Sequence, residues 1–158
     1  MIVFKSEVVI AQQIVFKKHK IFVFKWEGVT FNEKFRVSSA AGLEILRKNK
    51  HVNKLVLDLT DHSFLVPDDL IYISESSRNL IAKNHGVKYR LAVILPYDRL
   101  GQSSAMQYGK YLQDSKLMKV RYLNTQRESI MWLVGLAPLP MRILNSLKKT
   151  IKILLSKK

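Results

Sequence analysis

The chain contains no cysteine among its 158 residues. It therefore forms no disulfide and offers no thiolate for metal binding or nucleophilic attack. Long hydrophobic runs are also missing, since the longest uncharged apolar stretch, residues 130–141, contains Pro138 and Pro140. Spanning a bilayer takes roughly 20 apolar residues, so we expect no transmembrane helix. The N-terminus lacks the basic and apolar segments of a signal peptide, so we expect a cytoplasmic protein.

Acidic residues are scarce, and residues 129–158 contain none. The formal net charge is +15, and residues 142–158 supply six of the cations. Wound as a helix of about 3.6 residues per turn, this segment gathers its apolar residues within an arc of about 120°. The cations outside that arc are predicted to contact an anionic membrane surface or a protein partner; they are Arg142, Lys148, Lys149, Lys152 and Lys157. The alternative is that the arc packs on the domain or on another subunit of a homo-oligomer.

The remaining composition is that of a folded globular protein, with 47% hydrophobic and 25% charged residues. The length suits one hydrophobic core. We expect residues 1–135 to form one α/β domain. Residues 136–158 are predicted to be a proline-containing linker followed by a basic amphipathic helix.

Strand and helix patterns alternate along this domain. Residues 8–16 and 21–29 predict a β-hairpin with a cationic turn, Lys17-Lys-His-Lys20. Strands are then predicted at 54–59, 89–96 and 119–123, and helices at 30–49, 67–84 and 102–115, with a short helix after Thr125. Thr30 with Glu33, and Thr125 with Glu128, have the spacing of helix capping boxes. The order β-β-α-β-α-β-α-β-α predicts a single mixed β-sheet with an N-terminal hairpin and helices packed against it.

Several segments of residues 1–134 resemble small bacterial STAS-like proteins, which are related to anti-sigma-factor antagonists and are also described as STAS/SEC14-like. The resemblance is carried by Trp26-Glu-Gly28, Val56-Leu-Asp58, Pro67-Asp-Asp69, Leu91-Ala-Val-Ile94 and the segment from Glu128 to Leu133. It implies a STAS-like fold and a non-enzymatic regulatory or protein-binding module. In anti-sigma-factor antagonists a Ser or Thr before the second helix is phosphorylated. Here Thr60 and Ser63 are the hydroxyls available, but the glycine-containing motif is absent.

Ligand sites in open α/β sheets lie beyond the carboxyl ends of parallel strands. That edge is predicted to collect a ligand or phosphoswitch loop of Asp58, Thr60, Asp61, His62 and Ser63, and a pocket edge of Tyr97, Asp98, Gln102 and Ser103. Asp58, Asp61 and His62 include groups suited to acid–base catalysis or metal binding. We favour the alternative, in which both carboxylates accept hydrogen bonds within the turn and His62 is a solvated loop residue.

No catalytic motif supports an enzyme. The chain has neither a glycine-rich nucleotide loop nor a Gly-x-Ser-x-Gly elbow, and its histidines share no metal-ligand spacing. We therefore predict no catalytic residue, metal or cofactor. The sequence indicates a non-enzymatic regulatory or binding module, peripheral to the inner face of the membrane where its tail binds lipid. A nucleic-acid-binding protein driven by positive charge, or an enzyme of unknown reaction, are the alternatives.

Overall fold

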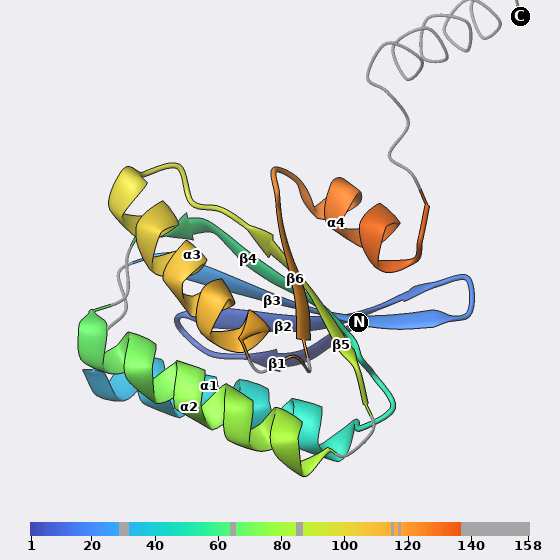
Figure 1. Ribbon diagram of the computed structural model, residues 1–158, viewed down its shortest axis with the longest axis horizontal. Coiled ribbons are helices and arrows are strands. Elements are labelled where there is room, and N and C mark those ends of the chain that lie inside the picture. The colour runs from blue at the N-terminus through green and yellow to red at the C-terminus, as the bar shows by residue number, and fades with distance from the viewer. Residues whose placement is uncertain (29–31, 64–65, 85–86, 115, 117, 137–158) are drawn as a thin grey trace, which may run out of the picture.

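The chain folds around one six-stranded β-sheet with the strands in sequence order, β1-β2-β3-β4-β5-β6. The computed structural model describes residues 1–28, 32–63, 66–84, 87–114, 116 and 118–136 (Figure 1). The strands are β1 (Ile2–Lys5), β2 (Val9–Phe16), β3 (His19–Gly28), β4 (Lys54–His62), β5 (Tyr89–Ile94) and β6 (Met118–Leu123). The helices are α1 (Asn32–Lys48), α2 (Pro67–Lys83), α3 (Arg99–Gln113) and α4 (Gln126–Leu133).

The predicted mixed sheet is confirmed. Strands β1, β2 and β3 pair antiparallel, and β3, β4, β5 and β6 pair parallel. The edge strand β1 was not predicted, because it is only four residues long and ends at a turn built by Ser6. The Ser6 hydroxyl accepts hydrogen bonds from the backbone N–H groups of Val8 and Val9. This turn folds β1 back along β2.

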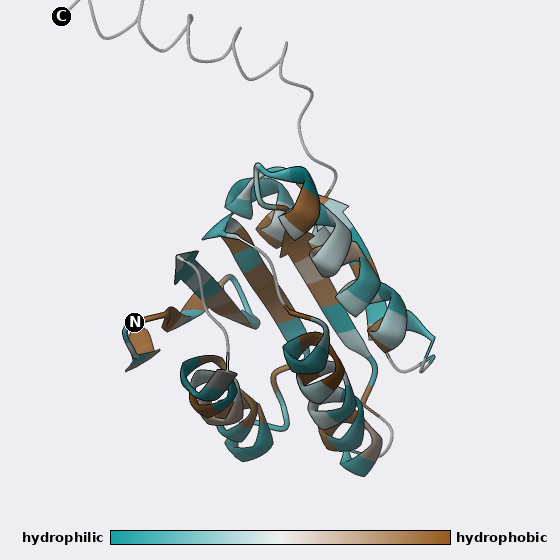
Figure 2. Cartoon of the chain, turned by 90° about the vertical axis from the view of Figure 1, so that its left-hand side faces the viewer, coloured by the Kyte–Doolittle hydropathy of each residue, from teal (hydrophilic) through white to brown (hydrophobic). Residues whose placement is uncertain are grey.

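Helices cover both faces of the sheet. Helices α1, α2 and α3 lie over one face, which we call the front, and α4 lies over the back (Figures 1 and 2). Alternate residues of β3 enter the two cores: Phe22 and Phe24 join the front core, and Ile21 and Val23 join the back core. Because successive strand side chains point to opposite faces, one strand serves both cores.

Side-chain caps begin two of the helices. The Asp98 carboxylate accepts the Gly101 N–H at 2.7 Å and starts α3 three residues before the predicted Gln102. The Thr125 hydroxyl accepts the Glu128 N–H at 3.2 Å, as the predicted capping box requires. The Glu128 carboxylate accepts the N–H of Asn124, the residue before the N-cap Thr125. Thr30, of the other predicted capping box, lies outside the described residues.

Arg90 holds the end of α4 against the start of β5. Its guanidinium donates to the backbone carbonyls of Trp132 and Leu133 at 2.6 and 3.1 Å, and lies 4.4 Å from the Trp132 ring centroid. A cation at a helix C-terminus is favoured by the helix dipole. Helix α4 therefore runs from the carboxyl end of β6 back to the amino end of β5.

Candidate functional site

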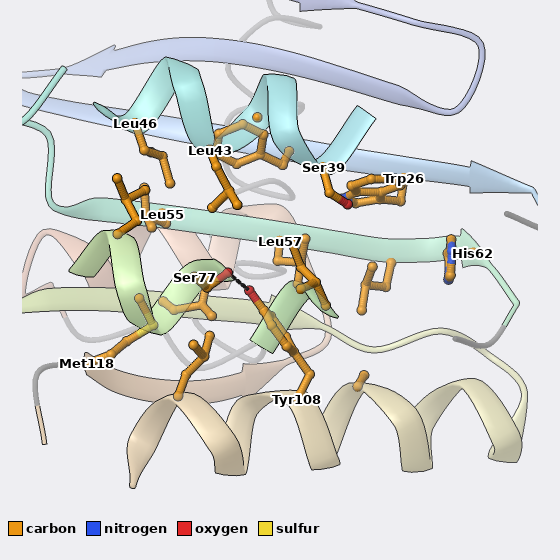
Figure 3. A pocket seen from close by; sticks show the side chains of 18 of the residues that line it. Trp26, Ser39, Leu43, Leu46, Leu55, Leu57, His62, Ser77, Tyr108 and Met118 are labelled. Atoms are coloured by element: carbon orange, nitrogen blue, oxygen red, sulfur yellow. Dashed lines mark hydrogen bonds between the residues drawn. The ribbon is translucent and has the colours of Figure 1, made fainter. Parts of the chain in front are cut away.

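The front core is not completely filled. A cavity of about 100 Å³ lies between the sheet and helices α1, α2 and α3 (Figure 3). Its walls are mainly apolar and include Trp26, Leu43, Leu46, Leu55, Leu57 and Met118. Figure 3 shows His62 at one end of the cavity and Met118 towards the other. The cavity therefore runs along the strands beneath the helical layer.

Small residues on the helices leave this space open. Ser39 and Gly42 of α1, Ser77 of α2 and Ala105 of α3 all line the cavity, where larger side chains would fill it. Leu57 lies opposite them in the middle of β4 and remains partly accessible, although β4 is an interior strand of the sheet. A well-packed core would have covered Leu57.

The polar groups of the cavity wall are few, and one of them has no partner. Ser39 is 2% exposed, and its hydroxyl makes no hydrogen bond. The hydroxyls of Ser77 and Tyr108 are 3.0 Å apart and hydrogen bonded to each other. Burial raises the pKa of Tyr108 to about 12, an effect that the bond to Ser77 opposes, so its phenol is neutral. Buried polar groups are normally paired, so the unpaired Ser39 hydroxyl is an exception that needs an explanation.

A β-bulge turns His62 into the cavity. Along β3 and β4, Lys25 pairs with Asp58 but Glu27 pairs with Asp61, so β4 carries one extra residue between these two pairs. The extra residue reverses the alternation of side chains, as bulges do. His62 consequently lines the front cavity, whereas Asp61 lies on the back face with Lys25.

The prediction that His62 is a solvated loop residue is therefore wrong. His62 is the last residue of β4 and is only 4% exposed. Burial lowers the pKa of His62, and the negative charge of Asp98 partly opposes this. Burial therefore favours the neutral form of the imidazole. The cavity end carries a neutral, weakly polar ring rather than a cation.

Three other residues of the predicted loop, Asp58, Thr60 and Asp61, lie on the opposite face of the sheet. The Asp58 carboxylate accepts the N–H and the hydroxyl of Thr60, at 3.1 and 2.7 Å, as predicted for a structural turn residue. Asp61 instead forms an ion pair with Lys25 at 2.8 Å. The bonds from Lys25 to Asp61 and Glu27 raise the pKa of Lys25. The sheet thus separates His62 from Asp58, Thr60 and Asp61, so these residues do not form one catalytic or metal centre.

The predicted pocket edge forms the start of α3. Tyr97 is 86% exposed, Ser103 is also exposed, and the Gln102 amide donates to the Pro96 carbonyl at 3.0 Å. Asp98 caps the helix and approaches His62 closely enough to affect its pKa.

The segment that follows β4 meets the first turn of α3 at a glycine. A Cβ added to Gly101 would collide with the carbonyl oxygen of Ser63. Ser63 and Asp98 therefore do lie at one edge, as predicted, with His62 behind them. Thr60 and Ser63 stay candidate hydroxyls for a phosphoswitch.

The remaining predicted contacts fall outside the described part of the chain. These are the tail residues Arg142, Lys148, Lys149, Lys152 and Lys157. Within the described ranges, no three His, Asp or Glu side chains come together as metal ligands. In the same ranges no helix is long and apolar enough to cross a bilayer.

Sequence reasoning missed Ser39, Ser77 and Tyr108 as site residues. Ser39 and Gly42 occupy the same helical face as Phe35, and this use of small residues on a buried face was the available signal. Periodicity marks such a face as buried. It does not show whether a neighbouring side chain or a cavity occupies the space above them.

Comparison with solved structures shows the class of fold. The chain is similar to an uncharacterised protein of the DUF3478 family from Shewanella loihica PV-4, whose structure is described as SpoIIAA-like. The TM-score is 0.52 at 15% sequence identity, over 82% of this chain and 98% of the other. The protein therefore has a SpoIIAA-like, STAS-like α/β fold, and the resemblance found in the sequence is confirmed at the level of the fold. No family model and no curated protein matches the chain.

Proposed function

We propose that the protein is a non-enzymatic binding and regulatory module whose ligand is a small, uncharged, largely apolar molecule. The observation that carries this proposal is the apolar cavity with the unpartnered Ser39 hydroxyl in its wall. Ligand pockets combine an apolar lining with a few polar groups that fix orientation. The STAS-like fold supports a regulatory role. We add to that role a ligand that binds in the core.

The size of the cavity restricts the ligand. An engineered cavity of about 150 Å³ in another protein stays dry and binds benzene. A cavity of about 100 Å³ therefore accepts a small ring or a short alkyl chain. A longer chain would have to pass out between the helices, beside lining residues that are only half-buried, such as Leu43 and Leu80.

The chemistry of the wall restricts the charge of the ligand. Among the described residues that line the cavity there is no lysine, arginine or carboxylate, and burial favours the neutral form of His62. Burying an unpaired charge in such surroundings is costly, so the part of the ligand inside is uncharged. One hydroxyl or carbonyl group would pair with Ser39. An alcohol or ketone satisfies these conditions better than a carboxylate does.

Ligand binding would act on the surface through the helices. The cavity is walled by three helices and the sheet, so its occupant contacts both β4 and α3, which approach each other where Ser63 meets Gly101. Two large side chains are exposed beside that meeting point, Tyr97 at 86% and Leu100 at 69%. We propose this edge as the contact for a protein partner in the cytoplasm, with the basic tail as a second contact for a partner or a membrane.

Thermal unfolding with a series of straight-chain alcohols, from ethanol to octanol, tests the proposal. A ligand that binds only the folded state raises the melting temperature. We expect the melting temperature to rise with chain length until the cavity is filled, and the carboxylic acid of the same length to have a smaller effect. A melting temperature that falls or stays constant throughout the series would refute the proposed ligand class.

A further inference from the structure

Charged residues are sorted along the strand direction of the sheet. The carboxyl ends of the parallel strands and the adjoining helix starts carry Glu27, Asp61, Asp68 and Asp98. The amino ends, which we call the basic edge, carry mostly lysines. The positive charge of the protein is therefore concentrated on one end of the domain.

The turn between β2 and β3 forms the most prominent part of the basic edge (Figure 1). Lys17, Lys18 and Lys20 are exposed there, and the adjacent Val15 is 62% exposed. The pKa of His19 is lowered by slight desolvation and by the positive charges of Lys54, Lys18 and Lys17. The β2–β3 turn and the start of β4 thus contribute to one positive field.

The next turns along the same edge add further cations. Lys50 precedes β4 and Lys54 begins it. Lys83 ends α2, and Lys88 directly precedes β5. Lys116 and Lys119 lie at the start of β6. All but Lys54 are exposed. Within the described residues, none of these six side chains forms an ion pair with a carboxylate. Their charge is available to an external partner.

The described part of the chain ends near this same edge. Arg90, at the start of β5, holds the carbonyl of Trp132 near the end of α4, and the described chain ends at Leu136. The 22 residues that follow contain cations and no acidic residue. The basic edge and the basic segment are therefore continuous along the chain.

We propose that the basic edge is a docking surface for an anionic lipid bilayer. Lysines near an anionic leaflet attract it, and the exposed Val15 can enter the interface between them. The sequence of the segment favours lipid over nucleic acid, because it repeats apolar residues such as Ile143, Leu147 and Leu154 at helical spacing. A bilayer interface buries such an arc, whereas a nucleic acid backbone does not. This docking surface does not depend on the ligand in the cavity.

Vesicle flotation of the full-length protein tests this assignment. The vesicles contain phosphatidylglycerol and phosphatidylcholine in roughly equal amounts, in a buffer of about 0.1 M salt, where the screening length is about 10 Å. One variant combines Lys18→Glu, Lys20→Glu and Lys50→Glu. The matched control combines Lys5→Glu, Arg99→Glu and Arg127→Glu, which change the charge equally on exposed residues at the carboxyl end of the domain. Circular dichroism confirms that both variants fold.

We expect wild type and control to float with the anionic vesicles and to be released by about 0.5 M salt. The basic-edge variant should lose more than tenfold in partitioning, since each cation near the leaflet contributes roughly a fivefold factor. Ser39→Leu should float as wild type does, because it alters only the cavity. The proposal is overturned if the basic-edge variant floats like the control, or if the wild type does not float with the anionic vesicles. If the protein does not float with vesicles but retards a nucleic acid duplex in a gel, the edge is assigned to nucleic acid instead.

Discussion

The imidazole of His62 lies edge-on to the indole of Trp26, with ring centroids 6.2 Å apart and ring planes at 82°. Edge-to-face packing of this kind holds both rings in one orientation. The two residues come from neighbouring strands and meet because of the bulge in β4. Together they form the end of the cavity nearest the carboxyl edge (Figure 3).

Acid should destabilise the protein through His62. Burial lowers the pKa of His62 in the folded state, so the unfolded chain binds a proton first as the pH falls through about 6.5. The free energy of unfolding should decrease below that pH and level off once the folded state is also protonated. Urea denaturation at pH 7.5, 6.5 and 5.5 measures this. In the His62→Gln variant the free energy of unfolding should decrease less as the pH falls. An equal decrease in the variant and the wild type would show that other groups cause it.

Two glycine substitutions should have opposite effects on stability. Gly101→Ala places a methyl group against the Ser63 carbonyl and should cost about 2 kcal/mol or more, because backbone must move. Gly42→Ala meets only the Phe24 ring at 3.5 Å and should add about 0.5–1 kcal/mol of stability through helix propensity. Chemical denaturation measures the free energy of unfolding of both variants and of the wild type. A stable Gly101→Ala protein would contradict the close approach of Ser63 to the first turn of α3.

Much of the fold was predictable, because periodicity and capping residues act locally. Pro67 and Thr125 began helices where expected, and the alternation of strands with helices gave the mixed sheet. The predicted site was less successful. The bulge that carries β4 past Leu59 to His62 depends on pairing with β3, a long-range interaction that a strand pattern does not contain. Likewise, the residues of the cavity come from three helices, and only their packing shows that Ser39 has no partner.

Arg90 should fix the position of α4. Arg90→Met keeps a long side chain but removes the hydrogen bonds to the carbonyls of Trp132 and Leu133. Charge-assisted bonds of this kind contribute roughly 1.5–3 kcal/mol, so we expect a loss of about 2 kcal/mol. Arg127→Met, on the exposed start of the same helix, is the control and should stay within about 0.5 kcal/mol of wild type. Equal losses would show that Arg90 contributes only its aliphatic stem.

Tyr108 should make the protein sensitive to alkali. Its pKa is raised to about 12 in the folded state, so the unfolded chain loses its proton first as the pH rises above about 10. Tyr108→Phe leaves the Ser77 hydroxyl unpaired and should cost about 1 kcal/mol at pH 8. The difference in the free energy of unfolding between wild type and Tyr108→Phe should shrink between about pH 10 and 11.5. Denaturation curves at pH 8 and pH 11 measure the difference, and a constant difference would contradict the burial of the phenol.

The most direct test of the cavity as a ligand site uses Trp26 as a reporter. The chain has two tryptophans, so Trp132→Phe leaves Trp26 alone beside the cavity. In that background, Ser39→Leu fills the cavity, and Ser74→Ala removes a second buried, unpartnered hydroxyl that does not line it.

Titration with 1-hexanol, followed by the fluorescence of Trp26, then measures binding. We predict a saturable change in emission that Ser39→Leu abolishes and Ser74→Ala retains. A titration without saturation, or the same saturation in Ser39→Leu, would contradict the assignment of the cavity as the ligand site.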